Sequence, residues 1–193
     1  MSVALRRSEN GESPLGSTAT DAVRRMEGAE IAVLNSAALR ADLEAGALTY
    51  GRLYETFPSA SPVATLRLNS SEVWALLVAL LASGHIPQQS GLRIEVGVCP
   101  TGLRLMGLEL EGGGRLVEGR LYRVVLPDNL ARGGEGLEAF MASLPDRRKD
   151  LGERRSLNLR DSLAADLARR GKPLVAPKPG RTSELRGEAA HCI

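Results

Sequence analysis

Few side chains in this sequence are of the kinds that bind metal ions or attack a substrate. The 193 residues include two histidines, His85 and His191, and two cysteines, Cys99 and Cys192. A dinuclear metal hydrolase site usually combines several histidines with carboxylates, and zinc or redox motifs need closely spaced cysteines. Neither pattern is present, so the sequence predicts no metal site. A disulfide between Cys99 and Cys192 is possible but not expected.

The common catalytic loop motifs are also missing. The chain has no GxxxxGK[ST] loop, no GxGxxG after a predicted strand and no GxSxG elbow, so the usual phosphate-binding loops and the hydrolase nucleophile turn are excluded. We therefore predict no catalytic residue and expect this polypeptide to be inactive alone.

A resemblance to a known family, whose motifs are given below, singles out two charged side chains as candidates for binding a ligand. Arg40 follows the apolar run 30–34, and a loop after a buried strand can present a guanidinium whose planar fork suits phosphate or carboxylate. Glu135 lies in the glycine-rich segment 133–136 and can accept a hydrogen bond from a sugar hydroxyl. The alternatives are a solvated or salt-bridged surface arginine, and a carboxylate that only caps a helix or complements its dipole.

Helices and strands alternate irregularly around these candidates. The patterns predict helices over 14–26, 49–56, 73–83, 137–144 and from Ser156 or Asn158 to 170, and strands over 30–34, 62–68, 92–98, 103–111 with a bulge near Gly107, and 121–126. Because there is no strict strand–helix–strand repetition, we expect an α+β fold, with a mixed β-sheet packed with helices. Trp74 lies in the most apolar helix and is expected in the core.

Composition excludes several classes of protein. The chain has 25 Lys and Arg against 23 Asp and Glu, which is too balanced for a nucleic-acid binder that relies on phosphate neutralisation. Its longest apolar run, 73–82, is about half the roughly 20 residues that cross a bilayer, so we expect no membrane segment. The segment 8–13 is polar where a signal peptide would be apolar, and the sequence leaves the compartment unknown.

The run 146–149 is basic, and either forms a solvated face or binds a phosphate or a partner.

Several motifs, taken in order, resemble one known family. They are Glu12–Gly16, Asp21–Arg24, the segment Gly28–Pro58 (GAEIAVLNSAALRADLEAGALTYGRLYETFP), Gln88–Leu92, Tyr122–Val124 and Gly133–Gly136. Together they resemble the C-terminal domain of the bacterial and animal 5′-nucleotidases. The likeness covers about residues 12–182, which leaves 1–11 as an N-terminal extension and 183–193 as an expected mobile tail.

The resemblance implies a division of labour between two domains. In that family an N-terminal metallophosphatase domain holds two divalent metal ions and hydrolyses the ester, while the C-terminal domain binds the substrate's nucleoside part. We therefore expect this chain to recognise a nucleotide or another small phosphorylated ligand and to hold no cofactor itself. Divalent metals are expected only in a partner metallophosphatase domain. Members of the family are commonly periplasmic or extracellular.

The resemblance also implies a binding site, with some departures from the family pattern. The family's N-x-GG-x-R loop has Ala37 and Ala38 in place of its glycines. The residues at the matching positions are Asn35, Arg40, Ser59, Ser61, Asn129, Gly133, Gly134 and Glu135. Ser59 and Asn129 stand where the family has two aromatic rings that hold the base. Ser61 replaces an asparagine of the family, and Glu135 replaces an aspartate. Phe57 is expected to pack inward. Base stacking contributes about 1–3 kcal/mol per ring, so losing both weakens binding by roughly two to four orders of magnitude.

Two functions remain open from the sequence. The first is substrate recognition for a phosphohydrolase with a separately encoded or separately expressed metallophosphatase half. The second is a non-catalytic binding or structural module whose pocket has been repurposed. A truncated product of a two-domain gene would leave no distinguishing mark in the sequence.

Overall fold

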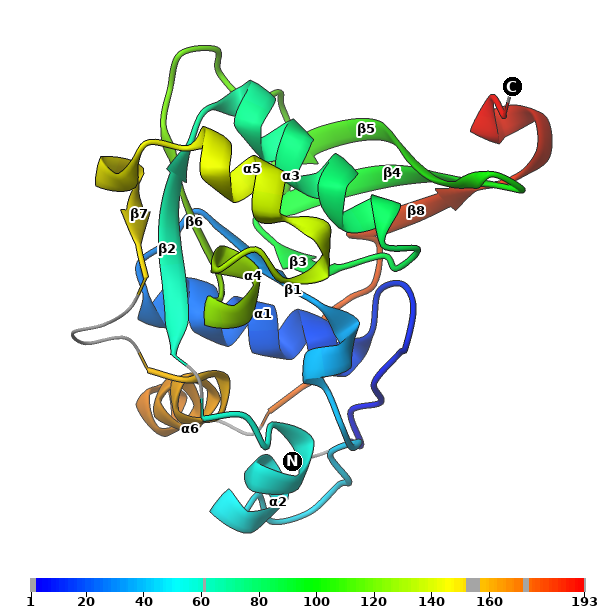
Figure 1. Ribbon diagram of the computed structural model, residues 1–193. Coiled ribbons are helices and arrows are strands. Elements are labelled where there is room, and N and C mark those ends of the chain that lie inside the picture. Colours follow the sequence, from blue (N-terminus) through cyan, green and yellow to red (C-terminus); the bar gives the residue numbers. More distant parts are fainter. Residues whose placement is uncertain (1–2, 61, 152–156, 172–173, 193) are drawn as a thin grey trace.

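The computed structural model describes residues 3–60, 62–151, 157–171 and 174–192. Its helices and strands are α1(Pro14–Met26), β1(Ile31–Leu34), α2(Tyr50–Thr56), β2(Val63–Leu68), α3(Ser70–Ala82), β3(Gln88–Ser90), β4(Leu92–Cys99), β5(Gly102–Leu110), β6(Tyr122–Pro127), α4(Asp128–Ala131), α5(Glu138–Ser143), β7(Lys149–Asp150), α6(Leu159–Arg170) and β8(Thr182–Leu185) (Figure 1). The helices and strands predicted from the sequence are present, with bounds that differ by a few residues.

The strands form two sheets. The larger has the order β3-β1-β6-β2-β7, in which β1 and β6 are parallel and the other pairs antiparallel. The smaller has the order β5-β4-β8, with β8 parallel to β4. The bulge predicted near Gly107 is present, because Glu95 pairs with Gly107 and the next residue, Val96, pairs with Leu105. Mixed sheets packed with helices confirm the predicted α+β class.

Alternating side chains of the larger sheet contribute to two hydrophobic clusters. Because successive strand residues point to opposite faces, Val33 and Leu66 join the cluster that includes α3 and α5, whereas Ala32 and Leu34 join the cluster that includes α1 and α6. Figure 1 shows α3 and α5 above the sheet and α1 and α6 below it. All four residues of β1 are buried, so this strand lies at the centre of the fold.

The helix caps follow the sequence signals. Ser13 caps α1 through a hydrogen bond from the Gly16 amide, with Pro14 at the first helical position. Asn69 and Glu72 form a reciprocal capping box on α3. Asn158 caps α6, which ends at Gly171 in the left-handed conformation with φ of 57°.

The prediction that Trp74 belongs to the core is wrong. The buried residues of α3 are Val73, Leu76, Leu77, Leu80 and Leu81. Trp74 lies outside this stripe and is 39% exposed. Val78, one turn later on the same side, is 43% exposed. Because α3 is apolar almost all round, its periodicity does not reveal which side faces the sheets.

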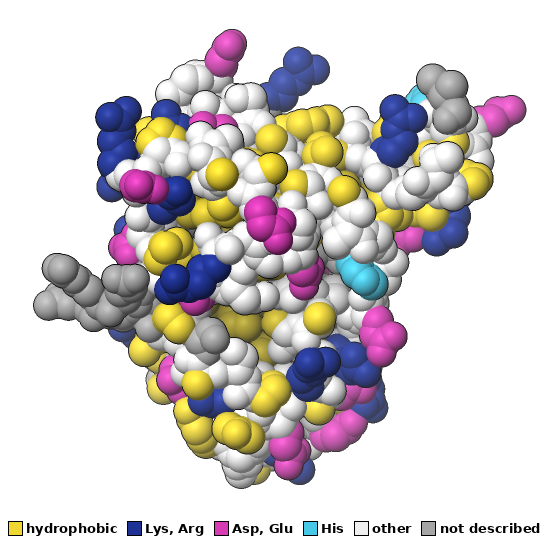
Figure 2. All heavy atoms as spheres, viewed as in Figure 1, with side chains coloured by type: hydrophobic (Ala, Val, Ile, Leu, Met, Phe, Trp, Pro, Cys, Tyr) yellow, Lys and Arg dark blue, Asp and Glu magenta, His cyan; other side chains and the backbone are white. Residues whose placement is uncertain are grey.

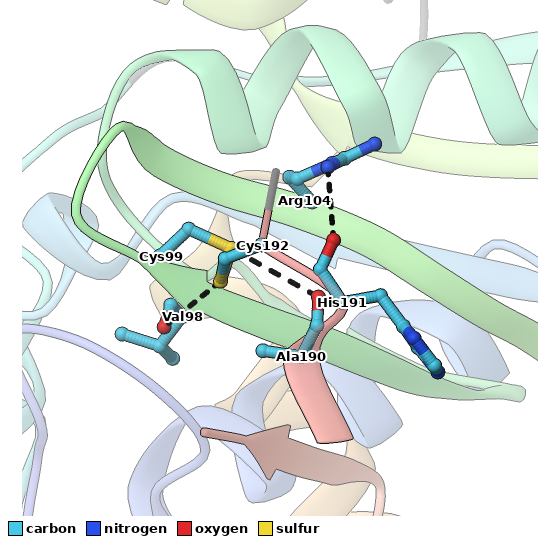
Figure 3. The surroundings of a disulfide bond; sticks show 6 residues. All are labelled: Val98, Cys99, Arg104, Ala190, His191 and Cys192. Carbon is cyan, nitrogen blue, oxygen red and sulfur yellow. Dashed lines mark hydrogen bonds between the residues drawn. A yellow bond between two sulfur atoms is a disulfide. The ribbon is translucent and has the colours of Figure 1, made fainter. Parts of the chain in front are cut away.

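The C-terminal residues do not form the free tail that the sequence suggests. Strand β8 pairs with β4, the residues Gly187–Ala190 form a 3-10 turn, and a disulfide joins Cys192 to Cys99 (Figure 3). The Arg104 guanidinium also donates a hydrogen bond of 3.3 Å to the His191 carbonyl. The sequence does not predict this disulfide, because only the folded chain brings two cysteines so distant in sequence together.

The N-terminal extension is also part of the packed domain. Leu5 is fully buried and forms an antiparallel bridge with Leu43. The Arg7 amide donates a hydrogen bond of 2.7 Å to the Asp42 carboxylate, and the Arg6 guanidinium contacts the same group. The Arg7 amide is the largest cause that holds the pKa of Asp42 below its ordinary value. Residues before the predicted domain boundary therefore help to hold the loop around Asp42.

Removal of the disulfide is expected to destabilise the domain. The bond closes a loop between positions 93 apart, so its loss in the Cys99→Ser/Cys192→Ser variant should lower the free energy of unfolding by about 2–4 kcal/mol. Guanidinium denaturation with and without reductant measures this difference. The wild type should become less stable in reductant, whereas the double variant should not respond. Equal stability of the oxidised wild type and the double variant would contradict the prediction.

Candidate ligand-binding site

The parallel pair of β1 and β6 brings two loops to one edge of the larger sheet. Ile31 is in register with Val124, and Ala32 with Val125. The loop after β1 begins at Asn35, and β6 runs into α4, which contains Asn129. The carboxyl ends of neighbouring parallel strands are a common place for ligands, because the loops that follow them converge.

The loop after β1 exposes Arg40. Residues Ser36–Ala38 form a 3-10 turn, the Leu39 side chain is buried, and the Arg40 amide donates a hydrogen bond of 2.9 Å to the Thr56 carbonyl. Arg40 itself is exposed. Within the described ranges, no side chain forms an ion pair or hydrogen bond with its guanidinium. The salt-bridged alternative is therefore not seen here.

The glycine-rich segment after α4 has a constrained backbone. Gly133 has φ of 98° and Gly136 of 81°, and between them Glu135 adopts φ of 56°, a region that non-glycine residues seldom occupy. A Cβ on Gly134 would lie 2.7 Å from the Asn129 carbonyl oxygen. The glycine at 134 thus lets this segment approach the residues that follow β6.

One hydrogen bond links the two loops. The Asn35 Nδ2 donates to Glu135 Oε1 at 2.5 Å. Neither the 3-10 turn at Gly134–Gly136 nor α5 receives a side-chain cap, so the capping role considered for Glu135 is not observed. Its carboxylate instead orients the Asn35 amide.

The other end of the Asn35 amide has no partner. Its Oδ1 is buried and accepts no hydrogen bond from any described residue. An unpaired buried acceptor costs about 1–3 kcal/mol, and a ligand hydroxyl or amine would remove that cost. The arrangement therefore offers an acceptor at Asn35 beside a cationic donor at Arg40.

Two cavities meet at these residues. Both cavities are lined by Asn35, Ala37 and Arg40. The first has a volume of about 270 Å³, and its other lining residues are Ala38, Phe57, Pro58, Ser59, Pro127, Asn129 and Leu159. The second has a volume of about 240 Å³, and its other lining residues are Arg7, Glu9, Ser36, Leu39, His85 and Glu135. Figure 2 shows a hollow with a hydrophobic floor between the surface near α4 and that near α2. Charges of both signs surround it.

The structure thus gathers most of the predicted site residues. Asn35, Arg40, Ser59 and Asn129 line the first cavity, and Glu135 lines the second. Gly133 and Gly134 line neither cavity but shape the loop that carries Glu135. Ser61 lies outside the described residues.

Sequence reasoning missed Arg7, Glu9 and His85 as lining residues. Arg7 and Glu9 belong to the segment taken as an extension, and His85 was interpreted as a solvated or locally bonded imidazole. Nothing in the local pattern of residues 1–11 marks Arg7 and Glu9 as part of a pocket, because contacts with distant residues, such as the bridge between Leu5 and Leu43 and the bond from the Arg7 amide to Asp42, bring this segment there.

Neither described cavity has an aromatic face that could replace the missing rings. Phe57 is 1% exposed and belongs to a core cluster, as predicted. Tyr50 and Tyr54 are more than half exposed, but they line neither cavity and stack on the Arg160 guanidinium at 5.2 and 4.9 Å. Besides Arg40, Phe57 and Leu159, the first cavity is lined by proline, alanine and small polar side chains.

The described part of the chain contains no group of three or more His, Cys, Asp or Glu residues placed to hold a metal ion. A search of the same residues finds no helix with the length and hydrophobicity to span a membrane.

Substitution of Gly134 by alanine should disturb the site. The added methyl group would lie 2.7 Å from backbone oxygen of Asn129, and such overpacking costs about 1–3 kcal/mol. Chemical denaturation measures the loss. Gly112→Ala is the control, because no atom lies within 4 Å of its Cβ position. Equal stability of the two variants would show that the close approach is not required.

Comparison with known proteins shows what the chain as a whole is similar to. The family model described as the 5′-nucleotidase C-terminal domain matches residues 1–142. Among solved structures, the 5′-nucleotidase precursor of Thermus thermophilus is 26% identical, with a TM-score of 0.78 over 95% of this chain and 38% of that protein. A search of curated proteins finds no match.

Two further structures share the fold. The NAD nucleotidase of Haemophilus influenzae is 17% identical, with a TM-score of 0.79 over 97% of this chain and 37% of that one. A sulfate thiohydrolase of Thermus thermophilus, solved with glycerol, is 19% identical, with a TM-score of 0.69 over 94% and 34%. This chain therefore spans less than two fifths of these proteins, and it belongs to the 5′-nucleotidase C-terminal domain family.

Proposed function

We propose that this chain is the substrate-recognition domain of a 5′-nucleotidase-type phosphohydrolase and binds a nucleotide or related phosphate ester. The observation that carries the proposal is the junction of the two cavities. There, the unpaired Asn35 Oδ1 and the exposed Arg40 lie on the walls of the same two hollows.

Each residue has a role that its chemistry suits. The Arg40 guanidinium binds an anionic or carbonyl oxygen of the ligand through its planar fork. The Asn35 Oδ1 accepts a hydrogen bond from a ligand hydroxyl or amine. Glu135 holds the Asn35 amide through Nδ2, and its second carboxylate oxygen remains a candidate acceptor for a sugar hydroxyl.

The proposal leaves hydrolysis to another domain. By resemblance to the family, a metallophosphatase domain would hold the divalent metal ions, and this chain would supply no metal ligand and no nucleophile. The domain would deliver the ester to those metals, so its contribution to catalysis is the binding and orientation of substrate.

The chain lacks the two aromatic rings that would stack on the base of a nucleotide. Ser59 and Asn129 line the first cavity where the family has rings, and they offer hydrogen bonds but no stacking. Each missing ring weakens binding by about 1–3 kcal/mol. We therefore propose that the sugar and phosphate parts of the ligand contribute most of the affinity.

The same observation favours a second candidate function. A cavity walled by Pro58, Pro127 and Ala38 fits a compact non-aromatic group as well as it fits a base. The alternative is a non-catalytic binding module in which the fold persists and the pocket serves another ligand.

Calorimetric titration with AMP, adenosine, a UDP-sugar and inorganic phosphate distinguishes the two. On the proposed function, AMP binds saturably, and Arg40→Gln weakens it at least tenfold, because a charge-assisted hydrogen bond contributes about 1.5–3 kcal/mol. Arg169→Gln is the matched control, since Arg169 is exposed and lines neither cavity. Absence of binding by AMP, adenosine and the UDP-sugar at millimolar concentration would contradict nucleotide recognition and favour the repurposed module.

A further inference from the structure

A second charged groove lies at the other end of β2 and β6. Its volume is about 310 Å³, and its lining consists of Thr65, Arg67, Arg123, Arg147, Arg148, Lys149 and Asp150. We call it the arginine groove. Five of its seven lining residues are cationic, although the whole chain carries a formal charge of only +2.

Strand pairing builds this groove. Arg67 of β2 lies directly opposite Arg123 of β6 in the antiparallel register. Strand β7 pairs along the other side of β2, with Leu66 opposite Lys149. The 3-10 turn Asp146–Arg148, which precedes β7, is thereby brought beside the two opposed arginines.

Two of the five cations already have partners. Arg148 binds both oxygens of the Glu72 carboxylate, at 2.8 and 2.9 Å. Lys149 forms an ion pair with Asp146 at 2.8 Å. These contacts hold Arg148 and Lys149 in place along one wall of the groove and neutralise the charges of these two side chains.

The other three cations are not neutralised in this way. No described residue forms an ion pair or a side-chain hydrogen bond with the guanidinium of Arg67, Arg123 or Arg147. The acids near them are Asp150, in the lining, and Glu27, whose pKa is raised by burial and lowered in part by the charge of Arg123. Like charges directly opposite each other across two strands destabilise a sheet, so the opposed pair has a cost that a bound anion would remove.

We propose that the arginine groove binds a phosphate-type oxyanion between the guanidinium groups of Arg67, Arg123 and Arg147. Guanidinium forks match the oxygens of phosphate, and several of them can share one dianion. The volume accommodates a phosphate group with its waters, or the phosphate end of a small ester. The chain as a whole carries 25 Lys and Arg against 23 Asp and Glu, and this balance does not suit a long polyanion.

This site is distinct from the ligand site at Arg40. Arg123 and Pro127 lie at opposite ends of β6, and Pro127 lines the first cavity. The four residue steps from Arg123 to Pro127 span roughly 13 Å along the strand. The proposal therefore does not depend on the proposed function.

Calorimetric titration with inorganic phosphate, sulfate and glycerol phosphate tests the groove, with sodium chloride holding the ionic strength constant. We expect saturable phosphate binding that weakens at least tenfold in Arg67→Gln and in Arg123→Gln and is unchanged in Arg169→Gln. The same variants are also measured in an Arg40→Gln background, so that phosphate binding at the Arg40 site does not contribute to the signal. Binding of glycerol phosphate would extend the ligand to esters, whereas its failure beside phosphate binding would restrict the site to the free anion.

Thermal melting provides a second readout that also verifies folding. Without ligand, Arg67→Gln should melt at the same or a higher temperature than the wild type, because the substitution removes a like-charge contact. With phosphate, the wild type should gain stability and the variant should not. Two results would overturn the proposal: phosphate stabilising the protein no more than chloride does, or phosphate binding that survives in Arg67→Gln/Arg123→Gln and disappears in Arg40→Gln.

Discussion

The parallel pairing of β1 with β6 is the constraint on which the candidate site depends. Both strands are largely buried and lie at the centre of the larger sheet. Because they run in the same direction, the loop that carries Asn35 and Arg40 and the segment that carries Asn129 and Glu135 leave the sheet at one edge. The opposite ends of β2 and β6 place Arg67 beside Arg123, so the same sheet positions both charged regions.

A hydrogen bond then connects the two loops that the sheet brings together. The hydrogen bond from Asn35 to Glu135 joins the two loops, and Glu135 holds a backbone conformation with φ of 56°. Strain of this kind persists where the surrounding structure determines it, and it concentrates at functional sites. Here it accompanies a buried Asn35 Oδ1 without a partner among the described residues and an exposed Arg40 guanidinium.

The sequence predicted much of this architecture for identifiable reasons. Caps such as Ser13, Asn69 and Asn158 are local signals, because the hydrogen bonds that define them lie within a few residues. The Arg40 and Glu135 candidates followed from a loop after a buried strand, a glycine-rich turn and the family resemblance. The binding role of these two residues is a prediction.

The parts that were missed depend on contacts between distant segments. The disulfide, the short strand β8 and the bridge from Leu5 to Leu43 leave no periodic pattern in the sequence. Trp74 was misplaced because a helix that is apolar on all sides does not reveal its buried face. The arginine groove likewise arises from register, since Arg67 and Arg123 meet only when β2 and β6 pair.

The most direct test of the account is to map the ligand site by NMR, following backbone and side-chain amide resonances of the labelled chain during titration with AMP. The account predicts that the largest shifts fall on the Asn35 side-chain amide, the Arg40 backbone and the segment Gly133–Gly136, because these groups surround the shared walls of the two cavities. Shifts that leave the Asn35 amide unchanged and gather elsewhere on the surface would contradict it.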